Sequence, residues 1–392
     1  MPFEVPEGWC WTTIGELFQL QAGKFIEAPQ ISTCKDATHI YPCYGGNGLR
    51  GYVESYNRDG LFPIIGRQGA LCGNINIAEG KFYATEHAVV VETFANIDIQ
   101  LFVYFLIQLN LNQYATATAQ PGLAVKTINE VPIPLPPINE QHRISMAIEK
   151  SLDTLSEIDQ SKHAISKSIL QLKSRILDLA ISGKLATQDC SDEPALELLR
   201  RINPSFAPCD NRHYANVPYK VPQKWQWVTL SDISNYGECI NVPVSNIPEN
   251  SWILELEDIE KDSGRLIQRM NRSKKNINGV RHSFKKGDVL YSKLRTYLNK
   301  VLVADQDGYC TTEIIPITCV PGIVPEYLCH VLRSRYYVDY TISLGYGVKM
   351  PRLGTADALK SMIPVPPYEE QKRIVKSVNE IYHKLEQISS EL

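Results

Sequence analysis

The chain has 392 residues, of which 44% are hydrophobic and 21% are charged. These proportions are those of an ordinary globular protein, and the length predicts two or three domains rather than a single core. The amino terminus lacks the basic stretch and apolar core of a signal peptide. The longest apolar run, residues 101–107, is too short to cross a bilayer. We therefore expect a cytoplasmic protein that does not associate with membranes.

The ten cysteines and eight histidines form no recognisable metal motif. No two cysteines stand in a C-x-x-C pair, although zinc sites usually take two of their ligands from one tight turn. The histidines are equally scattered along the chain. We therefore predict no metal site and no cofactor, and we expect reduced, partly buried thiols.

The formal net charge is −3, which argues against a protein that binds nucleic acid. The charge is uneven, however, because residues 218–366 contain 19 basic and 15 acidic groups and form the one segment with a positive excess. Net charge governs nonspecific attraction and its salt dependence, whereas sequence reading needs only a few well-placed side chains. Composition therefore weakens a DNA-binding interpretation without excluding it.

The chain contains an internal repeat. Residues 5–11 (Val-Pro-Glu-Gly-Trp-Cys-Trp) return as residues 221–227 (Val-Pro-Gln-Lys-Trp-Gln-Trp). Residues 133–144 end in Pro-Pro-x-x-Glu-Gln-x-Arg-Ile and return as residues 363–374 with the same motif. A repeat of such a long period indicates duplicated domains. Each copy is a globular domain that ends at two consecutive prolines, after which a new secondary-structure element begins. The tryptophans of the opening motif are expected to pack in the cores.

Each Pro-Pro stop leads into a predicted helix. Between residues 137 and 184, apolar residues recur at alternating steps of three and four, which is the heptad seam of a coiled coil. Residues 367–392 carry a shorter seam at Ile374, Val378, Ile381, Leu385, Ile388 and Leu392. We expect the two helices to pack on each other, which leaves roughly half of the longer seam without a partner.

The globular parts contain short apolar runs between Gly-, Asn- and Asp-bearing turns, a pattern typical of β-structure with few helices. We predict helices within these parts at 101–108 and 325–337. The predicted organisation is a mixed α/β domain at 1–136, the central helix at 137–184, a short helix (195–202) and linker at 185–217, a second mixed domain at 218–366 and a carboxy-terminal helix at 367–392.

This order of domain, long helix, domain and helix resembles the specificity subunits of type I restriction-modification systems. The similar motifs are the doubled Val-Pro-x-x-Trp-x-Trp, the doubled Pro-Pro-x-x-Glu-Gln-x-Arg-Ile, residues 180–185 (Ala-Ile-Ser-Gly-Lys-Leu) and residues 287–295 (Gly-Asp-Val-Leu-Tyr-Ser-Lys-Leu-Arg). The resemblance covers nearly the whole chain. It implies the α+β fold class, with two homologous target recognition domains separated by long helices that form an antiparallel coiled coil.

The resemblance also implies a function and partners. Each recognition domain would read one half of a split site on double-stranded DNA. The chain would thereby direct two DNA adenine methyltransferase subunits and, through the complex, restriction and translocase subunits. Repeated but unequal domains favour an asymmetric target. One alternative is the recognition chain of another multi-subunit restriction-modification type. The alternative from a different class is a standalone DNA methyltransferase.

The sequence offers no complete catalytic motif. An adenine methyltransferase needs a Gly-rich cofactor loop and an (Asn/Asp)-Pro-Pro-(Tyr/Phe) motif, but residues 365–368 (Val-Pro-Pro-Tyr) lack the polar first side chain. Residues 44–48 (Tyr-Gly-Gly-Asn-Gly) have glycines without the strand-then-helix setting of a nucleotide-binding loop. We therefore predict a non-catalytic chain with no catalytic residues.

The candidate DNA-binding residues are those whose side chains can pair with bases or attract phosphate. Arg and Lys pair with guanine, Asn and Gln pair with adenine, and any cation attracts phosphate. In the first domain the candidates lie in Gly-flanked turns and are Asn47, Arg50, Arg67 and Gln68. In the second domain they are the basic run Arg269, Arg272, Lys274, Lys275 and Arg281, together with Lys293, Arg295, Lys349 and Arg352. The alternative interpretation of each is a solvated turn or loop.

Overall fold

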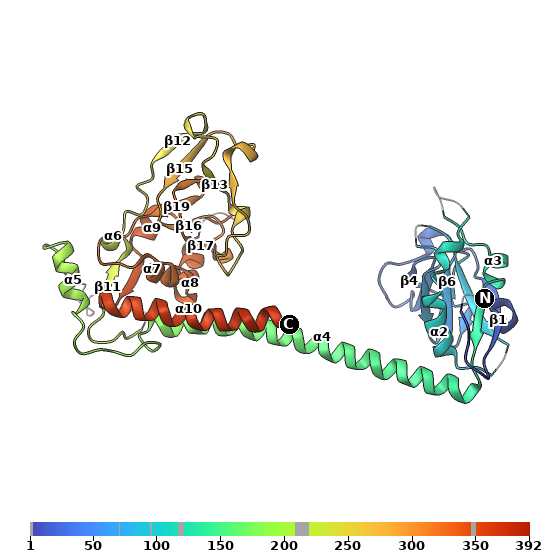
Figure 1. Cartoon of the computed structure of the whole chain (residues 1–392). Helices are drawn as coiled ribbons and strands as arrows, with labels where there is room; N and C mark the ends of the chain where they lie inside the picture. The colour runs from blue at the N-terminus through green and yellow to red at the C-terminus, as the bar shows by residue number, and fades with distance from the viewer. Residues whose placement is uncertain (1–2, 70, 95, 117–120, 208–218, 346–349) are drawn as a thin grey trace. The chain divides into compact units, whose positions relative to one another are not determined.

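The computed structural model describes residues 3–69, 71–94, 96–116, 121–207, 219–345 and 350–392 (Figure 1). The chain divides into two compact units, which we call unit 1 (Met1–Asp159) and unit 2 (Gln160–Leu392). The division falls inside the long helix α4 (Ile138–Ile181). Among the helices that the structure describes, none combines the length and apolar character needed to cross a bilayer.

Unit 1 is built on two four-stranded sheets, with strand orders β2-β9-β6-β7 and β4-β3-β8-β5, and a two-stranded sheet β1-β10. Its strands are β1 Cys10–Thr13, β2 Phe18–Ala22, β3 Tyr41–Gly45, β4 Gly48–Val53, β5 Arg58–Asp59, β6 Phe62–Gly66, β7 Ile75–Ala78, β8 Lys81–Ala84, β9 Ala88–Thr93 and β10 Pro132–Leu135. Besides α4, its helices are α1 Ile14–Leu17, α2 Ile99–Gln108, α3 Val125–Asn129 and the 3₁₀ turns η1 Ala28–Gln30 and η2 Leu111–Tyr114.

Unit 2 contains a five-stranded sheet β12-β15-β18-β13-β14, a three-stranded sheet β17-β16-β19 and a two-stranded sheet β11-β20. Its strands are β11 Gln226–Thr229, β12 Asn241–Pro243, β13 Trp252–Leu254, β14 Met270–Asn271, β15 Val280–Phe284, β16 Val289–Ser292, β17 Val301–Val303, β18 Gly308–Cys310, β19 Ile314–Ile317 and β20 Met362–Val365. Its helices are α5 Ala195–Ile202, α6 Leu230–Ile233, α7 Pro325–Arg333, α8 Arg335–Leu344, α9 Thr355–Leu359, α10 Tyr368–Glu391 and the 3₁₀ turns η3 Val244–Asn246, η4 Leu256–Asp258, η5 Arg272–Lys274 and η6 Thr296–Leu298.

The two units bury their central strands in the same way. In β6 of unit 1, Ile65 packs with α2 while the adjacent Ile64 packs toward β8. In β16 of unit 2, Tyr291 packs with α7 while the adjacent Leu290 packs toward β13 and β15. Successive side chains of a strand point to opposite faces, so both strands are buried on both sides. Apolar runs without alternation therefore mark the centre of each unit.

The repeat seen in the sequence is confirmed by strand register. In unit 1, Trp11 of β1 lies opposite Pro134 of β10, and in unit 2 Trp227 of β11 lies opposite Pro364 of β20. Trp227 is fully buried, whereas Trp11 is partly exposed. The expected core role of the tryptophans thus holds more completely in unit 2 than in unit 1.

One predicted helix is divided in two. The pattern of residues 325–337 indicates a single helix, but α7 ends at Arg333 and α8 begins at Arg335. Ser334 lies between them in an extended conformation, and its hydroxyl accepts a hydrogen bond from the backbone amide of Tyr337. A serine that caps a new helix competes with continuation of the old one, which the apolar periodicity does not reveal.

The glutamine of each Pro-Pro-x-x-Glu-Gln motif is buried and fastens the long helix to its domain. The Gln141 amide donates to the carbonyl of Pro136 (2.8 Å), and its oxygen accepts from the backbone amide of Asp98 (2.9 Å). Gln371 does the same with Pro366 (3.1 Å) and Val324 (2.8 Å). Asp98 and Val324 are the N-cap residues of α2 and α7. One side chain therefore joins the starts of two helices.

Within unit 2, α10 packs antiparallel on the second half of α4, which confirms the expected coiled coil there (Figure 1). The Tyr382 hydroxyl donates to the carbonyl of Lys173 (2.8 Å), and the Lys173 ammonium pairs with Glu386 (3.0 Å). Ile374 and Val378 of α10 are completely buried. Apolar side chains in the first half of α4 remain exposed, as the shorter seam of α10 predicts.

We predict that Gln371→Ala lowers the free energy of unfolding of unit 2. The substitution leaves the amide of Val324 and the carbonyl of Pro366 buried without this partner, at a cost of roughly 1–3 kcal/mol for each unsatisfied group. Urea unfolding followed by circular dichroism measures the change. Lys372→Ala, at the neighbouring exposed position, is the control. Equal effects of the two substitutions would contradict the role of Gln371 in fastening the long helix to its domain.

We predict that His330 makes unit 2 sensitive to acid. His330 in α7 is buried, neither ring nitrogen has a hydrogen-bond partner within the described part of the chain, and burial lowers its pKa to about 3. The unfolded imidazole binds a proton near pH 6.5 and the folded one does not, so stability falls as pH drops from about 6.5 towards 3. Between pH 7 and pH 5, His330→Leu should therefore lose about 2 kcal/mol less stability than the natural chain. Urea midpoints at both pH values check this, with the exposed His383→Leu as control.

Candidate DNA interface

The turn that follows β6 in unit 1 carries two of the predicted DNA-binding residues, Arg67 and Gln68. The amide of Arg67 donates to the carbonyl of His87 (2.9 Å), and its carbonyl accepts from the amide of Leu123 (2.9 Å). Gln68 forms an antiparallel bridge with Gly122. The Gln68 side chain is exposed and that of Arg67 is partly exposed. Hydrogen bonds on both sides therefore hold the backbone from which these side chains project.

The turn that follows β16 in unit 2 carries Lys293 and Arg295. The amide of Lys293 donates to the carbonyl of Glu313 (3.0 Å), and its carbonyl accepts from the amide of Leu353 (3.0 Å). Leu294 forms an antiparallel bridge with Arg352. The Arg352 guanidinium is held by the Glu313 carboxylate, with distances of 2.9 and 3.1 Å. Lys349 lies outside the residues that the structure describes.

The two turns are therefore the same site in the two repeats. Arg67 corresponds to Lys293, because each amide donates to the residue immediately before the neighbouring strand, His87 before β9 in unit 1 and Glu313 before β19 in unit 2. Nothing in the sequence alone relates the two clusters to each other. Their correspondence depends on hydrogen bonds between segments far apart in the chain, which only the folded units display.

The third residue of each turn has a left-handed backbone. Gly69 has φ 93° and its amide donates to Pro121, while Arg295 has φ 51° and its amide donates to Pro351. Glycine adopts this conformation without strain, whereas a residue with a Cβ atom pays roughly 1–2 kcal/mol. The Nε atom of Arg295 is also buried and has no hydrogen-bond partner among the described residues. Strain of this kind is typical of functional positions.

The loop between β3 and β4 brings Asn47 and Arg50 to the same region of unit 1. Residues 45–50 and His87 line a groove with a volume of about 410 Å³. A Cβ atom on Gly46 would lie 2.9 Å from the carbonyl oxygen of Gln68, so only glycine allows this approach. All four residues predicted in the first domain therefore lie around one groove and the adjoining turn.

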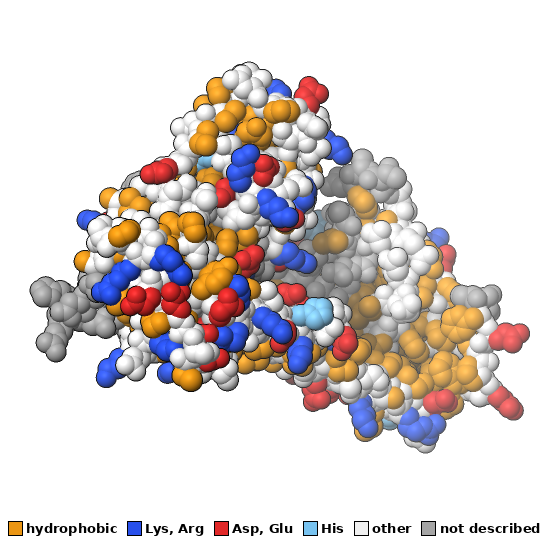
Figure 2. Space-filling model, turned by 60° about the vertical axis from the view of Figure 1, so that its left-hand side comes forward, with side chains coloured by type: hydrophobic (Ala, Val, Ile, Leu, Met, Phe, Trp, Pro, Cys, Tyr) orange, Lys and Arg blue, Asp and Glu red, His pale blue; other side chains and the backbone are white. Residues whose placement is uncertain are grey.

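Most of the basic run in the second domain is neutralised within the protein. Arg269 pairs with Asp305 (2.6 Å) and lies over the ring of Trp252. Arg281 pairs with Glu255 (2.9 Å). Arg272 donates to the carbonyl of Ile247 (2.5 Å), and Lys275 pairs with the buried Asp258. On the face drawn in Figure 2, basic and acidic side chains are accordingly interspersed rather than gathered into one basic patch.

Lys274 is the member of this run that is exposed and has no ion-pair partner among the described residues. It lines a polar groove of about 570 Å³ together with Gln268, Asn276 and Asn278. Amide side chains of this kind can pair with adenine. Sequence reasoning missed these three residues because in the second domain it weighed positive charge alone, although Asn276 and Asn278 lie within the basic run, between Lys275 and Arg281.

The described residues contain no group of three or more His, Cys, Asp or Glu side chains that could hold a metal ion. Burial raises the pKa of the Cys43 and Cys329 thiols to about 11 in both cases. A thiol with such a pKa stays protonated at neutral pH and is a poor nucleophile or metal ligand.

We predict that Lys275→Ala destabilises unit 2 rather than removing a DNA contact. Asp258 is completely buried, and its carboxylate accepts from Gln268 (2.8 Å) and from the amide of Glu255 (2.8 Å) in addition to Lys275. Removing the ammonium leaves a buried charge without its counter-ion, at a cost of roughly 3–5 kcal/mol. Chemical denaturation measures the loss. The exposed pair of Lys285 with Asp307 supplies the control, since Lys285→Ala should change stability little.

Comparison with known proteins finds a family model that matches the first part of the chain and relatives that match nearly all of it. Residues 6–170 match the type I restriction modification DNA specificity domain. The specificity subunit of the type I restriction enzyme EcoprrI from Escherichia coli is 42% identical over 167 residues, which cover 43% of this chain and 41% of that subunit. The chain thus spans less than half of the length of that relative. The EcoDI specificity subunit from Escherichia coli is 22% identical over 386 residues, which cover 97% of this chain and 82% of that subunit.

Solved structures share the fold. A chain from a study of complex assembly and conformational transition of the type I R-M system matches with TM-score 0.64 and 16% identity, over 100% of this chain and 94% of that one. The HsdS subunit from Thermoanaerobacter tengcongensis matches with TM-score 0.57 and 15% identity, over 100% of this chain and 93% of that one. This chain is therefore similar along nearly its whole length to type I restriction-modification specificity subunits, and its residues 6–170 match the DNA specificity domain of that family.

Proposed function

We propose that this chain recognises DNA sequence in the cytoplasm for a type I restriction-modification complex. Each unit contains one target recognition domain, and each domain reads one half of a bipartite, asymmetric target on double-stranded DNA. The observation that carries the proposal is the duplicated turn after β6 and β16. It has the same backbone hydrogen bonds in both units but different side chains.

The side chains at the duplicated turn suit different bases. Unit 1 presents Arg67 and Gln68, which can pair with guanine and adenine respectively, whereas unit 2 presents Lys293 and Arg295, both suited to guanine or phosphate. A shared backbone sets the approach to DNA, and the side chains then determine which bases are bound. Two different half-sites follow from this difference.

We propose that the chain is not itself an enzyme. The sequence that comes closest to a methyltransferase motif, Val-Pro-Pro-Tyr at residues 365–368, spans the end of β20 and the start of α10. There the carbonyl of Pro366 accepts from the buried Gln371 amide, which is a structural role. Methyl transfer and cleavage would be carried out by two partner DNA adenine methyltransferase subunits and by restriction subunits that the complex brings to the site.

We predict that alanine substitutions in the two turns act on different halves of the target. With a methyltransferase partner present, Arg67→Ala should relax one half-site and Lys293→Ala the other, each lowering affinity by about 1–3 kcal/mol. Sequencing of methylated bases across a genome identifies the affected half. Lys286→Ala, at an exposed position outside the turns, is the matched control.

Two outcomes would contradict the proposal. The first is that both substitutions alter the same half-site, or that neither alters the target. The second is methylation or cleavage of DNA by the purified chain alone, which would favour the standalone methyltransferase.

A further inference from the structure

The loops that line the grooves of unit 1 and unit 2 occupy the same place in the two repeats. In unit 1, the amide of Thr85 donates to the carbonyl of Tyr44 near the end of β3 (2.9 Å). In unit 2, the amide of Thr311 donates to the carbonyl of Leu254 at the end of β13 (3.1 Å). β3 pairs in parallel with β8, and β13 pairs in parallel with β18. The loop between β3 and β4 therefore corresponds to the loop between β13 and β14.

A segment of three residues joins each loop to the duplicated turn. In unit 1 it runs from Thr85, which contacts the loop, to His87, whose carbonyl accepts from the turn. In unit 2 it runs from Thr311 to Glu313 and makes the same two contacts. Loop and turn therefore lie beside each other in both units. A ligand that contacts the turn of unit 2 is within reach of the neighbouring groove.

The loop of unit 2 is the longer of the two, and it is built around a buried carboxylate. The side chain of Asp258 is completely buried. It accepts from the backbone amide of Glu255 at the start of the loop (2.8 Å) and from the side-chain amide of Gln268 near its end (2.8 Å). Lys275 is its counter-ion. The carboxylate thus ties the two ends of the loop together.

The same carboxylate fixes the orientation of the Gln268 amide. An ionised carboxylate only accepts hydrogen bonds, so Gln268 must turn its NH₂ group, and not its oxygen, towards Asp258. The oxygen and the second N–H remain for a ligand in the groove, where the Gln268 side chain is exposed. The other two amides of the groove, Asn276 and Asn278, have no side-chain hydrogen bond among the described residues. Gln268 is therefore the amide that is held ready in one orientation.

The charges around the groove balance one another. Two ion pairs account for four of them, Arg281 with Glu255 and Lys275 with Asp258. The other two charged side chains that line the groove are exposed and opposite in sign, Lys274 and Glu257. A groove without excess positive charge attracts phosphate weakly, whereas it suits the polar but uncharged edge of a base.

We propose that Gln268 is a specificity-determining residue that binds adenine in the half-site of unit 2. The assignment rests on the proposed function of the chain. Adenine presents an amino donor and the N7 acceptor side by side in the major groove, which match the oxygen and the remaining N–H of Gln268. Guanine presents two acceptors there, so the glutamine oxygen would be left unpaired. Asp258 is a positioning residue, because it acts through the Gln268 amide.

The first test compares the targets of variant chains by sequencing methylated bases across a genome, with a methyltransferase partner present. Lys293→Ala identifies the half-site of unit 2. Gln268→Ala should lower discrimination at one A·T pair of that half-site about tenfold or more and leave the other half-site unchanged. Gln268 is exposed and Asp258 keeps its other donors, so the variant should fold. Gln223→Ala, at an exposed position outside the groove, is the matched control and should leave the target unchanged.

A double variant tests the positioning role of Asp258. Asp258→Asn with Lys275→Met removes the carboxylate and its counter-ion together, so that neither charge is left buried and unpaired. An asparagine side chain both donates and accepts, so the Gln268 amide can then turn either way. This variant should accept guanine as well as adenine at the same position. A general loss of stability would weaken binding without this exchange of bases, and circular dichroism verifies the fold.

Two results would overturn the assignment of Gln268. The first is that Gln268→Ala leaves the target unchanged although Arg67→Ala and Lys293→Ala alter it, in which case the proposed function stands. The second is that the base pair relaxed by Gln268→Ala is G·C. If none of the three substitutions alters the target, the proposed function itself fails, and the assignment of Gln268 fails with it.

Discussion

Each unit depends on one buried glutamine that joins its long helix to the start of a domain helix. Gln141 and Gln371 use both ends of their amides, and both ends are shielded from water. A side chain so placed fixes the direction in which the long helix leaves the domain, since any rotation would leave a buried donor or acceptor unpaired. The Pro-Pro-x-x-Glu-Gln motif is therefore a structural joint, in which the prolines end a strand and the glutamine anchors the helix.

Beyond this joint the two units share the backbone of one turn but differ in its side chains. The turns after β6 and β16 keep the same hydrogen bonds but exchange glycine for a strained arginine at the left-handed position, Gly69 and Arg295. A scaffold that holds its turn by main-chain hydrogen bonds can change side chains without losing its geometry. Duplication followed by divergence of this kind suits a protein that must bind two unequal half-sites.

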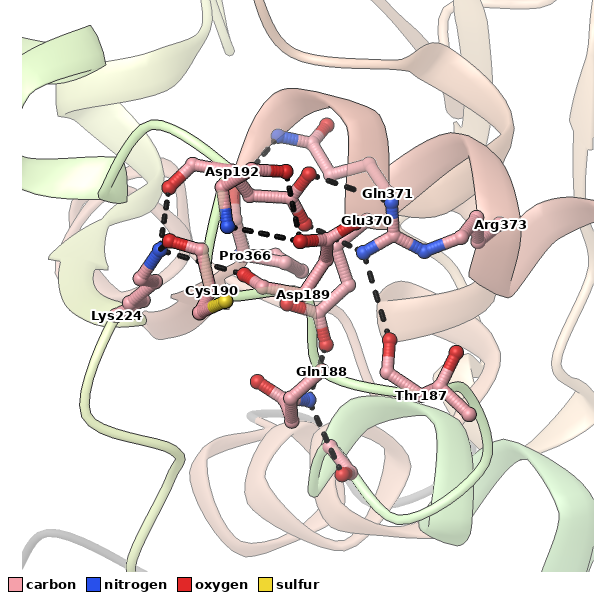
Figure 3. Close-up of polar contacts among 12 residues, drawn as sticks. Thr187, Gln188, Asp189, Cys190, Asp192, Lys224, Pro366, Glu370, Gln371 and Arg373 are labelled. Atoms are coloured by element: carbon pink, nitrogen blue, oxygen red, sulfur yellow. Dashed lines mark hydrogen bonds and ion pairs between the residues drawn. The ribbon is translucent and has the colours of Figure 1, made fainter.

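The Glu and Arg side chains of the same motif have different surroundings in the two units. Glu370 and Arg373 bind Gln188 and Asp192 of the segment that follows α4 (Figure 3), whereas among the described residues the side chains of Glu140 and Arg143 have no such partners. The asymmetry follows from chain order, because α4 is followed by a segment that can cross the start of α10.

The sequence by itself determined the repeat, the two heptad helices, the helix at 195–202 and the chemistry of the turn residues, because these depend on local periodicity and on motifs a few residues long. Only the tertiary structure decided which cations are available. Lys275 and Asp258, or Arg269 and Asp305, are separated by 17 and 36 residues and meet through sheet pairing. It also placed Arg67 and Lys293 at equivalent positions and divided α7 from α8 at Ser334. Long-range ion pairs and main-chain bonds decide these points, and neither leaves a periodic signal in the sequence.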